Sequence, residues 1–177
     1  MNLIIQQDLK LELIDDHHAG ALFAMLNNDK LYLREWMPWV DSQQSVDDTI
    51  RFVQHARKRH EAQNGFELAI MSNDSLVGIL GVHTIDHINR KCSLGYWLGE
   101  GYQGQGFMTK SCQALIDYCY DTLDLNRIEI RCATHNYKSQ GIPKRLHFIH
   151  EGTMRQAEYL NGAFVDHHLY AKLKSDR

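Results

Sequence analysis

Three strand-like runs follow one another in the middle of this chain, and the short connections between them restrict how they can pair. The runs span residues 66–72, 76–85 and 92–99, separated by Asn73-Asp74-Ser75 and by a turn at 88–91. A parallel crossover needs about a dozen residues or more, which neither connection provides. We therefore expect a mixed, mainly antiparallel sheet of the α/β (α+β) class, with helices packed against it.

The residues before these runs predict one more strand and two helices. Residues 9–14 alternate apolar and polar side chains, which is typical of a short strand, and Asp15 and Asp16 can then cap a helix. Ser45, with Asp48 three residues later, predicts the capped start of a second helix. The stretch 28–45 between the two helices breaks helical periodicity, so we expect it to be a loop.

The residues after the runs complete the expected order of elements. Apolar residues at helical spacing predict a helix over about 107–122, and residues 127–134 are typical of a strand. A short helix over 139–146 can hold Pro143 only in its first turn. Asn161-Gly162 predicts a type I′ turn that closes a terminal β-hairpin.

Composition excludes several classes of protein. The chain has 19 Lys and Arg against 22 Asp and Glu, and its net charge is −3. It therefore lacks the excess of basic residues that is typical of nucleic-acid-binding proteins. No apolar run approaches the roughly 20 residues of a membrane-spanning helix, and the first residues do not form a cleavable leader. The four cysteines and eleven histidines show no zinc-ligand spacing. We expect one cytoplasmic domain over residues 1–177, with reduced thiols and without metal, membrane or nucleic-acid partners.

A glycine-rich segment, Gly99 to Thr109, lies between the end of the third run and the start of the next helix. Glycine permits positive φ and close approach of a ligand, and the free N–H groups of a helix N-terminus attract anions. A plain strand-to-helix turn is the alternative interpretation. A Walker loop would need GK[ST] where the chain has Gly106-Phe107-Met108, and the glycine order differs from that of a Rossmann fingerprint. A diphosphate is the expected ligand, whereas hydrolysis of a nucleoside triphosphate and binding of a dinucleotide are not expected.

The segment Gln103-Gly104-Gln105-Gly106 resembles the coenzyme A loop of the GNAT acyltransferase superfamily. Phe107-Met108-Thr109 after it is similar to the branch of ribosomal-protein N-terminal acetyltransferases, the Rim type. Three further segments extend the resemblance: Leu94 to Leu98, Asn136-x-x-Ser139, and Gln156 to Gly162. It implies about seven strands flanked by about four helices, with acetyl-CoA as cofactor. His147 stands where the family commonly has a glycine in the left-handed conformation.

The resemblance implies a set of site residues. Those expected to bind the cofactor are Tyr96, Trp97, Leu98, Gln103, Gly104, Gln105, Gly106, Phe107, Met108, Thr109 and Asn136. Ser139 is the candidate for protonating the departing thiolate, although a serine there could equally cap its helix. Glu67 is the candidate base, with a solvated strand carboxylate as the alternative. Cys132 is either a core cysteine or a thiol close to that of coenzyme A.

The acceptor is expected to be a primary amine. Trp36, Trp39 and Tyr159 are candidates for lining the acceptor cleft, or else core aromatic residues. The Rim-like loop and hairpin favour a protein N-terminal α-amine, for example that of a ribosomal protein, attacked directly in a ternary complex. The alternatives are a small-molecule amine, such as a polyamine, amino acid or antibiotic, and a coenzyme A-binding module without turnover. Either a monomer or a homodimer is compatible with the sequence.

Overall fold

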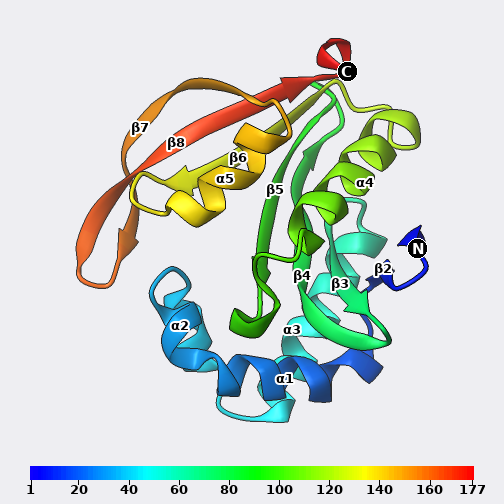
Figure 1. Ribbon diagram of the computed structural model, residues 1–177, viewed down its shortest axis with the longest axis vertical. Coiled ribbons are helices and arrows are strands. Elements are labelled where there is room, and N and C mark those ends of the chain that lie inside the picture. Colours follow the sequence, from blue (N-terminus) through cyan, green and yellow to red (C-terminus); the bar gives the residue numbers. More distant parts are fainter.

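The computed structural model describes residues 1–177 and contains one eight-stranded sheet flanked by five α-helices (Figure 1). The expected mixed sheet with helices against it is confirmed, with one strand and one helix more than anticipated. The strands are β1 (Asn2–Gln6), β2 (Leu9–Leu13), β3 (Phe66–Ser72), β4 (Ser75–Asp86), β5 (Lys91–Leu98), β6 (Arg127–Ala133), β7 (Ile149–Leu160) and β8 (Ala163–Leu173). The helices are α1 (Ala19–Asn28), α2 (Lys30–Arg34), α3 (Val46–Glu61), α4 (Phe107–Asp121) and α5 (Tyr137–Arg145).

The strand order across the sheet is β1-β2-β3-β4-β5-β6-β8-β7. Every neighbouring pair is antiparallel except β5 and β6, which are joined by the crossover helix α4 and run parallel. This parallel pairing lasts only from Lys91 opposite Arg127 to Leu94 opposite Ile130. Beyond that point β5 and β6 diverge, and the sheet opens in a V (Figure 1).

Two apolar cores lie on opposite faces of the sheet. The larger one joins the sheet to α4 and α5, because Cys112, Leu115 and Ile116 form a fully buried stripe on α4 at helical spacing. The smaller one joins the other face to α1 and α3 through residues such as Leu22 and Val53. None of the helices combines the length and apolar character needed to cross a membrane.

Local capping follows the sequence closely. Ser45 and Asp48 form the expected capping box at the start of α3. Asn161 and Gly162 have φ values of 48° and 91° in the hairpin turn. His147 has a φ of 59°, so it takes the left-handed conformation in which the family commonly has glycine.

Three expectations about elements were wrong. The edge strand β1 was missed, because its sequence does not alternate apolar and polar residues: Leu3, Ile4 and Ile5 follow one another. The stretch 28–45 is not simply a loop, since it contains α2 and a short 3-10 helix, η2 (Pro38–Ser42). The helix α5 begins at Tyr137 rather than at 139, so Pro143 lies in its interior, and the N-cap is Asn136.

Candidate active site

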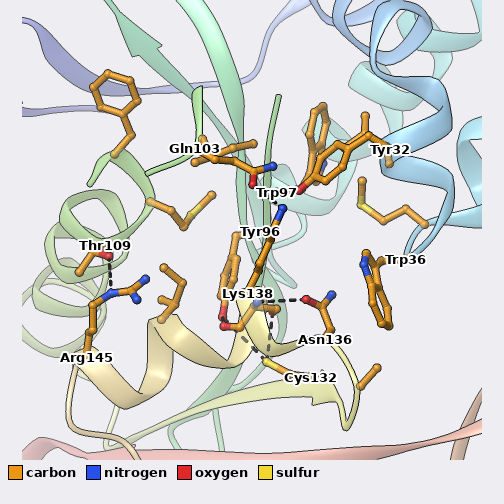
Figure 2. Close-up of a pocket in the computed structure, with 18 of the residues that line it drawn as sticks. Tyr32, Trp36, Tyr96, Trp97, Gln103, Thr109, Cys132, Asn136, Lys138 and Arg145 are labelled. Atoms are coloured by element: carbon orange, nitrogen blue, oxygen red, sulfur yellow. Dashed lines mark hydrogen bonds between the residues drawn. The ribbon is translucent and has the colours of Figure 1, made fainter. Parts of the chain in front are cut away.

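A cavity of about 1050 Å³ lies where β5 and β6 diverge (Figure 2). Its walls come from five segments: α2, the end of β5, the glycine-rich loop with the start of α4, the end of β6 with the start of α5, and the terminal hairpin. The lining includes most of the residues expected to form the site, namely Trp36, Tyr96, Trp97, Leu98, Gln103, Gly104, Gly106, Phe107, Met108, Thr109, Asn136 and Ser139.

The glycine-rich loop presents bare backbone to this cavity. Gly106 is the N-cap of α4 with a φ of 81°, and no side chain caps the helix. Gly104 has a φ of 74°, and a Cβ placed there would meet no atom within 4 Å. Because the first-turn N–H groups of α4 have no side-chain partner, they are available to an anionic ligand.

Positive charge gathers around the same cavity. Its lining contains four cationic side chains, Lys110, Arg131, Lys138 and Arg145, against a single carboxylate, Glu158. Nε of Arg145 donates to Oγ1 of Thr109 over 3.2 Å, at the start of α4. The cavity therefore suits a ligand with several negative charges, as the phosphates of coenzyme A require.

Of the two polar atoms of the Gln103 side chain, one has a hydrogen-bond partner and the other has none. Nζ of Lys138 donates to its Oε1 over 3.0 Å, and the same ammonium lies 5.4 Å from the centre of the Tyr32 ring. Nε2 of Gln103 is buried and has no hydrogen-bond partner. A buried donor of this kind is costly unless a ligand satisfies it, which makes Gln103 a fitting contact for the cofactor.

The open edge of β5 forms another wall. The last paired residue toward β6 is Leu94, whereas β5 continues to Leu98 and stays paired on its other side with β4. The backbone of Tyr96, Trp97 and Leu98 thus faces the cavity along one edge. A ligand with amide groups can add to such an edge as an extra strand, as the pantetheine arm of coenzyme A would.

Ser139 lies in the first turn of α5 and does not cap the helix. Oδ1 of Asn136 accepts the Ser139 N–H over 3.0 Å, so Asn136 is the cap. The Ser139 hydroxyl lies 3.2 Å from Sγ of Cys132. Cys132 is buried and lines the cavity, so it is both a core cysteine and a neighbour of the site.

Glu67 is not brought into the cavity. Its side chain is on the α3 face of the sheet and only 6% exposed, where one carboxylate oxygen lies 2.5 Å from Nη2 of Arg59 and 3.5 Å from Nε2 of His83. The carboxylate packs over Gly81 of the neighbouring strand, in the space that a side chain there would fill. Glu67 thus belongs to a partly buried ion pair on the opposite side of the sheet from α4 and α5.

Three other expected residues also lie outside the cavity lining. Nε2 of Gln105 donates to the carbonyl of Gly101 over 3.3 Å. The Trp39 ring stacks on Phe52 at 6.3 Å between centroids. Tyr159 is 63% exposed and packs edge-on against Phe164 on the outside of the hairpin.

The pair Glu158 and His167 was not predicted as part of the site. Nε2 of His167 lies 2.9 Å from Oε2 of Glu158, and both residues line the cavity. The hairpin turn contained the signal: it sets Glu158 opposite Val165, which makes His167 a diagonal neighbour on the same face. Lys138, Arg145 and Tyr32 were missed as well, because nothing in their local sequence distinguishes them from surface residues.

Comparison with known proteins agrees with this geometry. The family model described as an acetyltransferase (GNAT) domain matches residues 8–149. The ribosomal-protein-serine acetyltransferase of Escherichia coli (strain K12) is 32% identical over 169 residues, covering 96% of this chain and 94% of the relative.

Solved structures show the same architecture. The ribosomal L7/L12 α-N-protein acetyltransferase RimL, in complex with coenzyme A in disulfide linkage with a cysteine, superposes with a TM-score of 0.95 at 32% identity, covering 100% of each chain. The microcin C7 self-immunity acetyltransferase MccE, in complex with acetyl-CoA and AMP, gives 0.93 at 27% identity, covering 96% of this chain and 94% of that one. The chain belongs to the GNAT acetyltransferase family and is an N-acetyltransferase that uses acetyl-CoA.

Proposed function

We propose that this enzyme transfers the acetyl group of acetyl-CoA to the α-amine of a protein N-terminus in the cytoplasm. The observation that carries the proposal is that one cavity combines an anion-binding loop, the Ser139 hydroxyl and the Glu158–His167 pair. The named acceptors of its relatives, ribosomal proteins, support the choice of a protein N-terminus.

One end of the cavity binds the cofactor, and the other end receives the acceptor amine. Bound acetyl-CoA supplies an acetyl group activated as a thioester. At the cofactor end, the N–H groups at the start of α4, together with Arg145 and Gln103, hold the phosphates. The open edge of β5 near Leu98 positions the pantetheine arm and offers a backbone N–H to the acyl oxygen.

Two proton transfers complete the reaction. The acceptor nitrogen forms a bond with the acyl carbon while the carbon–sulfur bond breaks and its electron pair goes to sulfur. Glu158 takes the proton that the nitrogen loses, and His167, 2.9 Å away, holds that carboxylate in place. Ser139 gives its hydroxyl proton to the departing sulfur and recovers one from solvent. In this scheme Glu158, rather than Glu67, is the base.

The acceptor end is partly closed by the terminal hairpin. Nδ2 of Asn161, at the hairpin tip, donates to the carbonyls of Glu35 over 3.0 Å and Arg34 over 3.4 Å, at the end of α2. Trp36 lines the cavity just beyond that contact. Because this contact covers one side of the acceptor end, we expect the site to admit the free end of a peptide more readily than a bulky group.

A panel of amines tests the acceptor. One peptide carries a free α-amine and arginine in place of lysine; its control has a blocked N-terminus and a single lysine. A polyamine, an aminoglycoside and an aminoacyl nucleotide complete the panel, the last because MccE was solved with AMP. We expect acetyl-CoA-dependent acetylation of the free α-amine, measured by mass spectrometry and thiol release. Acetylation confined to a small molecule would overturn the proposed acceptor while leaving acetyl transfer intact.

A further inference from the structure

The helix α5 lacks one of its own hydrogen bonds, and the gap falls at Ser139. Within an α-helix each carbonyl accepts the N–H four residues later. The residue four positions after Ser139 is Pro143, which has no N–H to donate. The Ser139 carbonyl is therefore left without its helical donor, in the turn that carries the hydroxyl at the active site.

A side chain from the sheet supplies the missing donor. The hydroxyl of Tyr96 donates to the Ser139 carbonyl over 2.9 Å. Tyr96 lies on β5 two residues past Leu94, the last residue of β5 that pairs with β6. Its side chain therefore connects β5 to α5 at the point where the two strands separate. Figure 2 shows its ring standing between β5 and α5 with its hydroxyl close to Cys132. Burial raises the pKa of this phenol well above its usual value, so the group stays protonated and remains a donor.

Ser139 is consequently fixed at two backbone atoms by two side chains from different elements. Asn136 accepts its N–H and Tyr96 donates to its carbonyl. The hydroxyl is then placed 3.2 Å from the Cys132 sulfur, at the cavity wall. We propose that Tyr96 is a positioning residue for Ser139, acting through the carbonyl that Pro143 leaves free. This inference rests on the role given to Ser139 in the proposed function.

The arrangement allows a test in which one substitution rescues another. Tyr96→Phe removes only the hydroxyl, so the strand backbone that faces the cofactor is retained. Pro143→Ala restores an N–H that can satisfy the Ser139 carbonyl from within the helix. The measurements are kcat and KM for acetyl transfer and the calorimetric affinity for acetyl-CoA, for both single variants and the double variant, with thermal unfolding checked for each.

We expect Tyr96→Phe to lower kcat about five- to fifty-fold, because the Ser139 carbonyl would lose its donor and the first turn of α5 would no longer be fixed at that point. The affinity for acetyl-CoA should stay within about twofold, because the lost contact is not to the cofactor. In the Pro143→Ala background, the same change should lower kcat by no more than about threefold, since the sites are coupled. An equal loss in both backgrounds, or no loss in either, would overturn the inference.

Ser139→Ala separates this inference from the proposed role of Ser139 itself. If Ser139→Ala lowers kcat and Tyr96→Phe costs nothing more in that background, both ideas stand. If Ser139→Ala lowers kcat but Tyr96→Phe alone has no effect, only the positioning role of Tyr96 fails. If Ser139→Ala keeps full turnover, the proposed role of Ser139 fails, and the inference fails with it.

Discussion

The hydroxyl of Ser139 lies 3.2 Å from the sulfur of Cys132, where the first turn of α5 meets the last residues of β6. Two groups able to exchange a proton with a thiol thus lie side by side at the wall of the cavity. Since Asn136 caps the helix, the Ser139 hydroxyl is not needed for that purpose. This frees it for chemistry and makes its loss informative.

Ser139→Ala should lower kcat with little change in the affinity for acetyl-CoA. A hydroxyl that acts only as the thiolate leaves contributes to the transition state rather than to binding, and a loss of about 10²-fold is typical of one proton donor. Steady-state kinetics together with calorimetry separate the two effects. A variant that keeps its kcat but binds acetyl-CoA poorly would show that Ser139 is a cofactor contact instead.

Glu158→Gln should lower the activity of the enzyme, whereas Glu67→Gln should lower its stability. Glu158→Gln removes the only carboxylate of the cavity lining, so kcat should fall by about 10²- to 10⁴-fold with the fold intact. Glu67→Gln weakens a partly buried ion pair with Arg59, which should destabilise the protein by about 1–2 kcal/mol and lower its Tm by roughly 2–8 °C. Activity assays and thermal melts on both variants check this pair. The reverse pattern would restore Glu67 as the candidate base.

Cys132 should form a mixed disulfide with coenzyme A under oxidising conditions. Burial raises the pKa of its thiol, although hydrogen bonds to Ser139 and Tyr96 oppose that rise. Because the thiolate is the reactive form, a raised pKa moves the reaction to higher pH, so the rate should still be climbing above about pH 8.5. Intact-protein mass spectrometry follows the adduct.

The other cysteines provide the control for this prediction. Cys92, Cys112 and Cys119 are buried in the core and do not line the cavity. Cys132→Ala should therefore abolish the adduct, whereas Cys112→Ala should leave it unchanged. An adduct that persists in Cys132→Ala would place the reactive thiol elsewhere.

Much of the fold could be predicted from local patterns. The short turns after β3 and β4, the capping box at Ser45 and the Asn161-Gly162 turn each have a strong local cause, and the structure contains all of them. The expectations that failed depended on context. The edge strand β1 has no apolar–polar alternation in its sequence, and the carbonyl that the interior proline of α5 leaves free accepts a hydrogen bond from Tyr96 of a distant strand.

The lining of the cavity was predictable where its residues are adjacent in sequence and less so where folding brings them together. The glycine-rich loop was recognisable because glycine at positive φ has few other uses beside a helix N-terminus. Glu158 and His167 become a pair only through the hairpin register. Glu67 lies outside the cavity for the converse reason: a carboxylate among apolar residues can be paired with a cation from a distant helix, here Arg59 of α3.

The most direct test of this account is a calorimetric titration of acetyl-CoA into the wild-type enzyme and into Gly106→Val. At Gly106, with a φ of 81°, a branched side chain would strain the backbone and crowd the N–H groups at the start of α4. Gly101→Ala is the matched control, because a Cβ at that position of the same loop meets no atom within 4 Å and no positive φ is required. We predict micromolar binding by the wild type and Gly101→Ala, and a loss of about tenfold or more in Gly106→Val. Equal affinity in all three proteins would contradict the assignment of the glycine-rich loop as the cofactor site.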